Sequence, residues 1–235
     1  MRHIVTILAI ASIVAFVTDA LAQNTPALTV TAEGIGSDGY IEPEFAFCIP
    51  AATLHVKPGP DKSIGLYWSE GPEGTKSYAI IGVDTDVPTV FDDAGKEGKT
   101  LPATMPRRNF YHWVLFDIPV GTHQIPAYTD SQAIVQHGKS VLKTPYGIRG
   151  VNDYAPYFAS DPNRKGVYAG YDGPCPPWND ALIHHYHFKV YALDVKSLKL
   201  SGEVTGSKAE AAIQSHVLAV GEVIGKYTLN PKAAK

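Results

Sequence analysis

The sequence predicts a mostly β protein: a single-domain antiparallel β-sandwich with a C-terminal helix and a long loop cover. Several short apolar or alternating runs have the spacing of strands, and no helices alternate with them, which argues against a doubly wound parallel fold. Residues 121–166 are rich in Tyr, Pro, Gly and Asn and have little periodicity. Because so long an irregular segment is uncommon in a compact domain unless it is functional or internally packed, we expect it to cover one end of a sheet.

The individual elements follow from periodicity. Residues 77–84 form a largely apolar run, which predicts a central strand buried on both faces and stopped at Pro88. Ser207 is placed to cap a helix that continues to about Glu222. The other strands are expected at 28–32, 64–68, 109–119, 184–194 and 225–229.

A glycine motif at residues 34–39, Gly-Ile-Gly-Ser-Asp-Gly, matches the spacing of a dinucleotide fingerprint. That fingerprint requires a helix to begin within it, and the residues that follow lack helical periodicity. We therefore expect a turn.

The N-terminus has the pattern of a secretory signal. Arg2 precedes an apolar run shorter than a membrane-spanning helix, and Ala20 and Ala22 suit cleavage before Gln23. We expect residues 1–22 to be a signal peptide and 23–235 to be one domain, periplasmic or secreted, with no transmembrane anchor after cleavage. The formal net charge of −3 gives no reason to expect a nucleic acid or an anionic membrane as partner.

Cys48 and Cys175 are the two cysteines. Export would permit a disulfide, and an even count leaves one intramolecular pairing. We expect that bond, the alternative being two buried free thiols.

The stretch 170–194 joins an irregular loop to a strand. Glycines and consecutive prolines make 173–177 a rigid loop without regular structure. In the following strand, His184 and Tyr186 share the apolar face, whereas His185 and His187 point the other way. A histidine and a tyrosine would therefore line a pocket beside the loop.

Other polar residues could join them. Asp84 and Asp86 follow the buried strand, and His112 lies on the apolar face of another. If these strands meet at one end of a sheet, the acids, imidazoles and phenol would suit a phosphate or phosphate ester. The same residues also have simpler interpretations, because the acids can form turns and the ring side chains can be core packing.

Two other chemistries remain open. A metal could bind to His112, His184 and Asp84, but His184, His185 and His187 alternate in direction and cannot easily share an ion. Ester hydrolysis by Asp84 with His112 is conceivable, yet no nucleophile motif is present. We assign no catalytic residue, no metal and no cofactor.

The motifs together resemble the phosphatidylethanolamine-binding protein family, which includes the Raf kinase inhibitor proteins, and in particular its bacterial exported members. They are the segments 84–88 (Asp-Thr-Asp-Val-Pro), 112–115 (His-Trp-Val-Leu), 117–119 (Asp-Ile-Pro), 173–177 (Gly-Pro-Cys-Pro-Pro) and 184–188 (His-His-Tyr-His-Phe). The resemblance extends from about residue 41 to 227. It departs at Thr85 and Val87, where the family has Pro and Ala, and at His185, where Arg is common.

The resemblance implies a β-sandwich with an anion pocket at one end. The ligand-binding residues it implies are Asp84, Asp86, His112, Gly173, Cys175, Pro177, His184 and Tyr186. We expect a small anion or a phosphorylated headgroup as the ligand, with a hydrolase as the alternative. A third possibility is a module that inhibits another protein through the cover at 121–166.

Overall fold

The computed structural model describes residues 27–233, so the predicted signal peptide lies outside the described residues. A short 3-10 turn, Pro43–Phe45, precedes β2. The strands and helices are β1 (Val30–Glu33), β2 (Cys48–Ala51), β3 (His55–Pro58), β4 (Gly65–Trp68), β5 (Ser77–Pro88), β6 (Arg107–Pro119), β7 (Gln124–Ile125), β8 (Lys143–Thr144), β9 (Gly147–Arg149), α1 (Tyr154–Tyr157), β10 (His184–Leu193), α2 (Gly206–Gln214) and β11 (Val217–Tyr227). No helix among residues 27–233 is long and apolar enough to cross a membrane.

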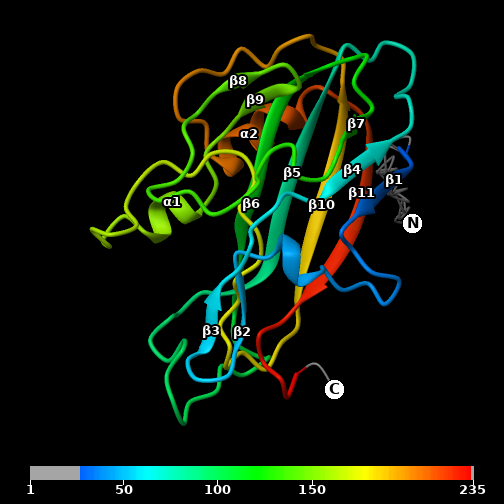
Figure 1. Ribbon diagram of the computed structural model, residues 1–235. Coiled ribbons are helices and arrows are strands. Elements are labelled where there is room, and N and C mark those ends of the chain that lie inside the picture. Colours follow the sequence, from blue (N-terminus) through cyan, green and yellow to red (C-terminus); the bar gives the residue numbers. More distant parts are fainter. Residues whose placement is uncertain (1–26, 234–235) are drawn as a thin grey trace, which may run out of the picture.

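A six-stranded antiparallel sheet forms the centre of the molecule, in the order β11-β10-β5-β6-β9-β8 (Figure 1). A three-stranded sheet, β1-β4-β7, covers one of its faces, and α2 packs on the opposite face. The mostly β sandwich with a helix towards the C-terminus is therefore confirmed.

Strand β5 is buried on both faces, as its apolar run predicts. Tyr78 and Ile80 pack towards the three-stranded sheet, whereas Ala79 and Ile81 pack towards α2. The strand ends at Pro88, where the sequence predicts that it stops. Its pairing with β6 is irregular between Asp84 and Val87, where the Asp86 N–H donates to Asp84 Oδ1 at 2.8 Å.

The C-terminal helix is shorter than predicted. It ends at Gln214, and Thr205 rather than Ser207 caps it by accepting from the Lys208 N–H. Residues expected to continue the helix form β11, which pairs with nearly the whole of β10. The close approach of Leu28 explains Gly221, because a Cβ there would lie 2.3 Å from the Leu28 carbonyl oxygen.

The segment 121–166 is not simply a loop cover, because it contributes strands to both sheets: β7 pairs with β4, and β9 and β8 extend the large sheet beyond β6. It also contains α1. The glycine motif at 34–39 forms a turn, as expected, in which the Gly39 N–H donates to the Gly36 carbonyl.

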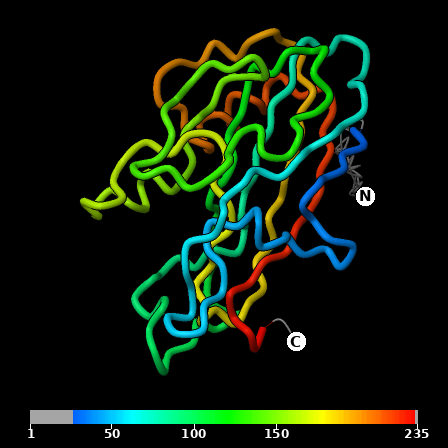
Figure 2. The backbone as a smooth tube through the Cα atoms, viewed as in Figure 1, coloured from blue at the N-terminus to red at the C-terminus, as the bar shows by residue number. Residues whose placement is uncertain are grey.

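The β2-β3 hairpin lies at one end of the large sheet, beside the connection between β5 and β6 (Figure 2). The predicted disulfide is present: Cys48 at the start of β2 is joined to Cys175 in the 173–177 loop. The Cys48 N–H also donates to the Pro174 carbonyl. The bond therefore fixes the hairpin against the loop.

Candidate ligand-binding site

A cavity of about 200 Å³ lies between this hairpin, the 173–177 loop and the ends of β5, β6 and β10. Four polar residues from the large sheet line it: Asp84, His112, His184 and Tyr186. Each comes from one of the three neighbouring strands, so the antiparallel register brings together residues that are distant in sequence. We call these four residues the polar floor.

His184 opens β10 and is held between two carboxylates. Its Nδ1 lies 2.7 Å from Asp84 Oδ2, and its Nε2 lies 3.2 Å from Asp180 Oδ2. Burial alone would lower the pKa of His184, but the hydrogen bonds to Asp180 and Asp84 outweigh it and raise that pKa to about 9. His184 is therefore a cation at neutral pH.

Asp180 has a second cationic partner. Arg107 Nη1 and Nη2 donate to its two carboxylate oxygens at 2.5 and 3.0 Å, a bidentate pair. Burial would raise the pKa of Asp180, but hydrogen bonds from His184 and Arg107 keep it below the usual value. Two carboxylates, Asp84 and Asp180, thus balance the two cations. The four side chains Arg107, His184, Asp84 and Asp180 together carry no net positive charge.

His112 has one ring nitrogen committed to the protein. Its Nδ1 lies 2.8 Å from the Asp172 carbonyl oxygen. Because a carbonyl only accepts, Nδ1 carries the hydrogen and the neutral ring has its lone pair on Nε2. Burial lowers the pKa of His112, against the opposing effect of the Asp84 charge, so the ring is neutral at neutral pH.

The Tyr186 hydroxyl is buried and makes no hydrogen bond of normal geometry with the described residues, although the Asp84 carboxylate lies near enough to act on it. The side chain is 1% exposed, and its ring meets that of His112 edge-on at 5.2 Å. Burial, reinforced by the Asp84 charge, raises the pKa of Tyr186 well above its usual value. The phenol is therefore neutral, and its hydroxyl can both donate to and accept from a ligand.

Six of the eight predicted site residues line the cavity: Asp84, His112, Cys175, Pro177, His184 and Tyr186. Asp86 and Gly173 do not line it.

Asp86 Oδ2 accepts from the backbone N–H and Nδ1 of His185, each at 2.8 Å. His185 thus supplies a partner for Asp86 where the family commonly has Arg. The Gly173 N–H donates to Asp61 Oδ1 at 2.7 Å, and its carbonyl accepts from the Tyr154 hydroxyl at 2.8 Å. Both backbone groups of Gly173 are therefore used within the protein.

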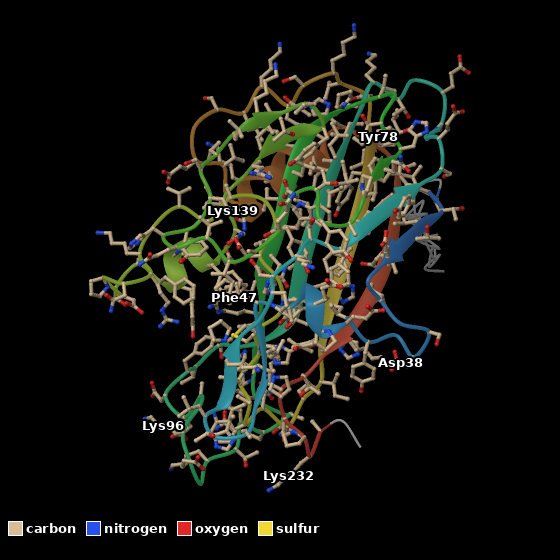
Figure 3. The ribbon with its side chains drawn as sticks, in the orientation of Figure 1. Asp38, Phe47, Tyr78, Lys96, Lys139 and Lys232 are labelled. Carbon is tan, nitrogen blue, oxygen red and sulfur yellow. A yellow bond between two sulfur atoms is a disulfide. The ribbon has the colours of Figure 1, made fainter. Side chains whose placement is uncertain are left out.

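Sequence reasoning missed the walls of the cavity, which are largely aromatic: Phe47, Phe91, Phe110, Tyr154, Tyr157 and Phe158. Figure 3 shows Phe47 close to the end of the β2-β3 hairpin. These rings come from separated segments, and no spacing in the sequence links them. Asp180 was also missed, although its position four residues before His184 was a usable signal.

The metal alternative fits the geometry poorly. No group of three or more His, Cys, Asp or Glu side chains within 27–233 is arranged to hold a metal ion. Both His184 nitrogens already face carboxylates, so ligation of an ion by this residue would break an existing pair.

Comparison with known proteins decides the family. The model of the phosphatidylethanolamine-binding protein family matches residues 33–228. The chain belongs to this family. Its relatives include a UPF0098 protein of Pyrococcus horikoshii, 34% identical over 155 residues that span 64% of this chain and 68% of the relative. The UPF0098 protein YbcL of Escherichia coli is 28% identical over 173 residues, 73% of this chain and 74% of YbcL.

Solved structures of the family share the fold. The crystal structure of E. coli YbcL, described as a new member of the mammalian PEBP family, aligns with a TM-score of 0.60 at 24% identity. The alignment covers 86% of this chain and 98% of YbcL. A PEBP homologue from Chlamydia trachomatis aligns with a TM-score of 0.51 at 22% identity, covering 86% of this chain and 97% of the homologue. At these identities the likeness extends to the fold alone.

Proposed function

We propose that this chain is a binding protein that holds a small anion or a phosphorylated headgroup, such as phosphate or phosphoethanolamine, without transforming it. The observation that supports this most strongly is the unpartnered Tyr186 hydroxyl, buried in the cavity beside His112. A buried polar group without a partner is costly, so a ligand that supplies the partner gains affinity.

The floor is complementary to an acid group that carries a proton. Tyr186 can donate to a ligand oxygen, and His112 Nε2 can accept from a ligand O–H. A singly protonated phosphate offers both groups, and a fully ionised one offers only acceptors. Because the Asp84 charge also faces the cavity, the singly charged form is favoured.

Tyr186→Phe tests the role of the hydroxyl. Since this group makes no hydrogen bond of normal geometry within residues 27–233, its removal should leave the free energy of unfolding unchanged or slightly raised. Removing a hydrogen bond to a charged ligand should weaken phosphate binding about tenfold or more. Isothermal titration calorimetry with inorganic phosphate and phosphoethanolamine measures this loss.

Two further variants complete the experiment. His112→Ala should also reduce binding, because it removes the Nε2 acceptor. His187→Ala is the matched control, because His187 lies on the opposite face of β10, paired with Glu222 at 2.9 Å. Unchanged affinity in both Tyr186→Phe and His112→Ala would refute the proposed site.

We also propose that the protein works in an exported, oxidising compartment, periplasmic or secreted. The Cys48–Cys175 disulfide supports this, because such bonds are rare in reducing cytosol. Fractionation of cells that express the full chain tests the proposal, and recovery of the protein in the cytosol with two free thiols would contradict it.

A further inference from the structure

The cavity continues beyond the polar floor as an aromatic chamber. Nearest to the floor, Phe110 lies 4.9 Å and Tyr154 5.5 Å from the His112 ring, measured between centroids. Further out, Phe158 and Tyr157 line the cavity, with centroids 5.0 Å apart. These rings lie within one continuous space with the floor, so a ligand seated on the floor also meets them.

The rings hold one another in place. Phe47 stacks on Tyr154 at 4.5 Å, and Tyr154 stacks on Phe158 at 5.4 Å. Phe110 meets Tyr154 edge-on at 5.2 Å. Such packing fixes the faces and edges that a ligand would contact, so the chamber is largely formed before a ligand arrives.

The volume is larger than a phosphate ion requires. An apolar cavity of about 150 Å³ in an engineered protein binds benzene. The cavity here measures about 200 Å³, which accommodates one aromatic ring and an acid group but not the acyl chains of a whole lipid. A bare phosphate would leave the aromatic chamber without a solute.

We propose that the occupant is an aromatic oxyacid: one planar ring carrying a carboxylic or phosphoric acid group. The acid group contacts Tyr186 and His112 Nε2, and the ring packs against the cavity-facing sides of Phe110, Tyr154 and Tyr157. This inference rests on the proposed function, because it uses the same floor. The new element is the group attached to the acid, which we assign as one aromatic ring.

Arg164 fits this assignment as a residue of the cavity wall. Its guanidinium lies 4.3 Å from the centroid of Phe158 and 2.5 Å from Asp161 Oδ2. The Arg164 charge is therefore already partnered by an aromatic face and a carboxylate. Because this pair is exposed, water screens the Arg164 charge, and the apolar rings contribute more to the selection of the ligand's outer part.

Calorimetry on the full chain with matched probes tests the proposal. Phenyl phosphate should bind at least about tenfold more tightly than inorganic phosphate, because it buries a ring. It should also bind about three- to tenfold more tightly than n-butyl phosphate, because aromatic contacts add to apolar burial. Benzoate compared with acetate repeats the comparison for a carboxylate, which must take up one proton to hydrogen-bond with His112 Nε2, and identifies the preferred acid group.

Tyr157→Ala is the informative variant. The side chain is 49% exposed, so the fold should tolerate its truncation. The preference for phenyl phosphate over butyl phosphate should fall while the affinity for inorganic phosphate stays the same. Tyr40→Ala is the control, because Tyr40 lies under Lys226 and away from the cavity, and it should retain the preference.

The outcomes separate this inference from the proposed function. If inorganic phosphate binds and phenyl phosphate binds no more tightly than butyl phosphate, the aromatic assignment is overturned and the anion site stands. If benzoate binds more tightly than acetate and none of the phosphates binds, the aromatic assignment stands and the phosphate ligand is refuted. If no acid binds, both proposals fail.

Discussion

Because the buried His184 is a cation, the stability of the protein should fall as the pH rises into the alkaline range. His184 has a folded-state pKa of about 9, above its usual value of 6.5, because two carboxylates hold its proton. The proton held by His184 therefore contributes stability that is fully present below about pH 6.5. That contribution is lost as the pH rises through about 9. The perturbation we consider is His184→Gln, which removes the titrating group.

The magnitude follows from the two pKa values. Between about pH 7 and 9.5, the wild-type protein should lose about 2 kcal/mol of unfolding free energy through His184 alone. His112 does not contribute between about pH 7 and 9.5. Its folded-state pKa is lowered from the usual value of 6.5, so any effect of its titration on stability falls at lower pH. The buried tyrosines act only above their unfolded pKa of about 10.

Urea unfolding at several pH values across this window measures the effect. The difference between wild type and His184→Gln isolates His184 from other groups, including the buried Asp61, whose pKa burial raises well above its usual value. The variant should be less stable near neutral pH, and the gap should narrow by about 2 kcal/mol as the pH rises to about 9.5. A constant gap would show that His184 is not held as a cation and would refute the reasoning.

Other predictions follow from the disulfide, the ligand proton and a second buried ion pair. Replacing Cys48 and Cys175 by Ala should cost about 4–5 kcal/mol, because the bond joins residues separated by 127 positions, and thermal unfolding with and without reductant measures the loss. Binding of phosphoethanolamine at about pH 7.5 should take up close to one proton, seen as a binding enthalpy that depends on the buffer, and equal enthalpies in all buffers would contradict this. Lys139→Met should destabilise the fold by about 3–5 kcal/mol in urea, because it leaves the buried Asp172 carboxylate without its cation. The double variant with Asp172→Leu should recover part of that loss, and no recovery would count against the pairing.

The sequence predicted well those features that depend on local periodicity. His184 and Tyr186 share the buried face of β10, whereas His185 and His187 are only partly buried, as strand alternation requires. Two cysteines in one chain left a single possible bond, and the structure contains it.

It predicted poorly those features that long-range packing determines. The apolar residues at 217–220 suit a helical face as well as a strand, and pairing with β10 decides in favour of β11. Lys139, in the segment before β8, reaches Asp172 and the Tyr171 carbonyl, yet its sequence context resembles an exposed loop (Figure 3). The aromatic chamber was missed for the same reason, because Phe47, Phe110 and Phe158 meet only in the folded chain.

The central claim is that an acid group binds between Tyr186 and His112 Nε2. The most direct test is nitrogen-15 NMR of the His112 ring during titration with phosphoethanolamine. We predict that free His112 is the neutral form protonated on Nδ1, and that the Nε2 resonance shifts towards the protonated or hydrogen-bonded position in step with binding. Binding without a change at Nε2 would place the ligand elsewhere and contradict the claim.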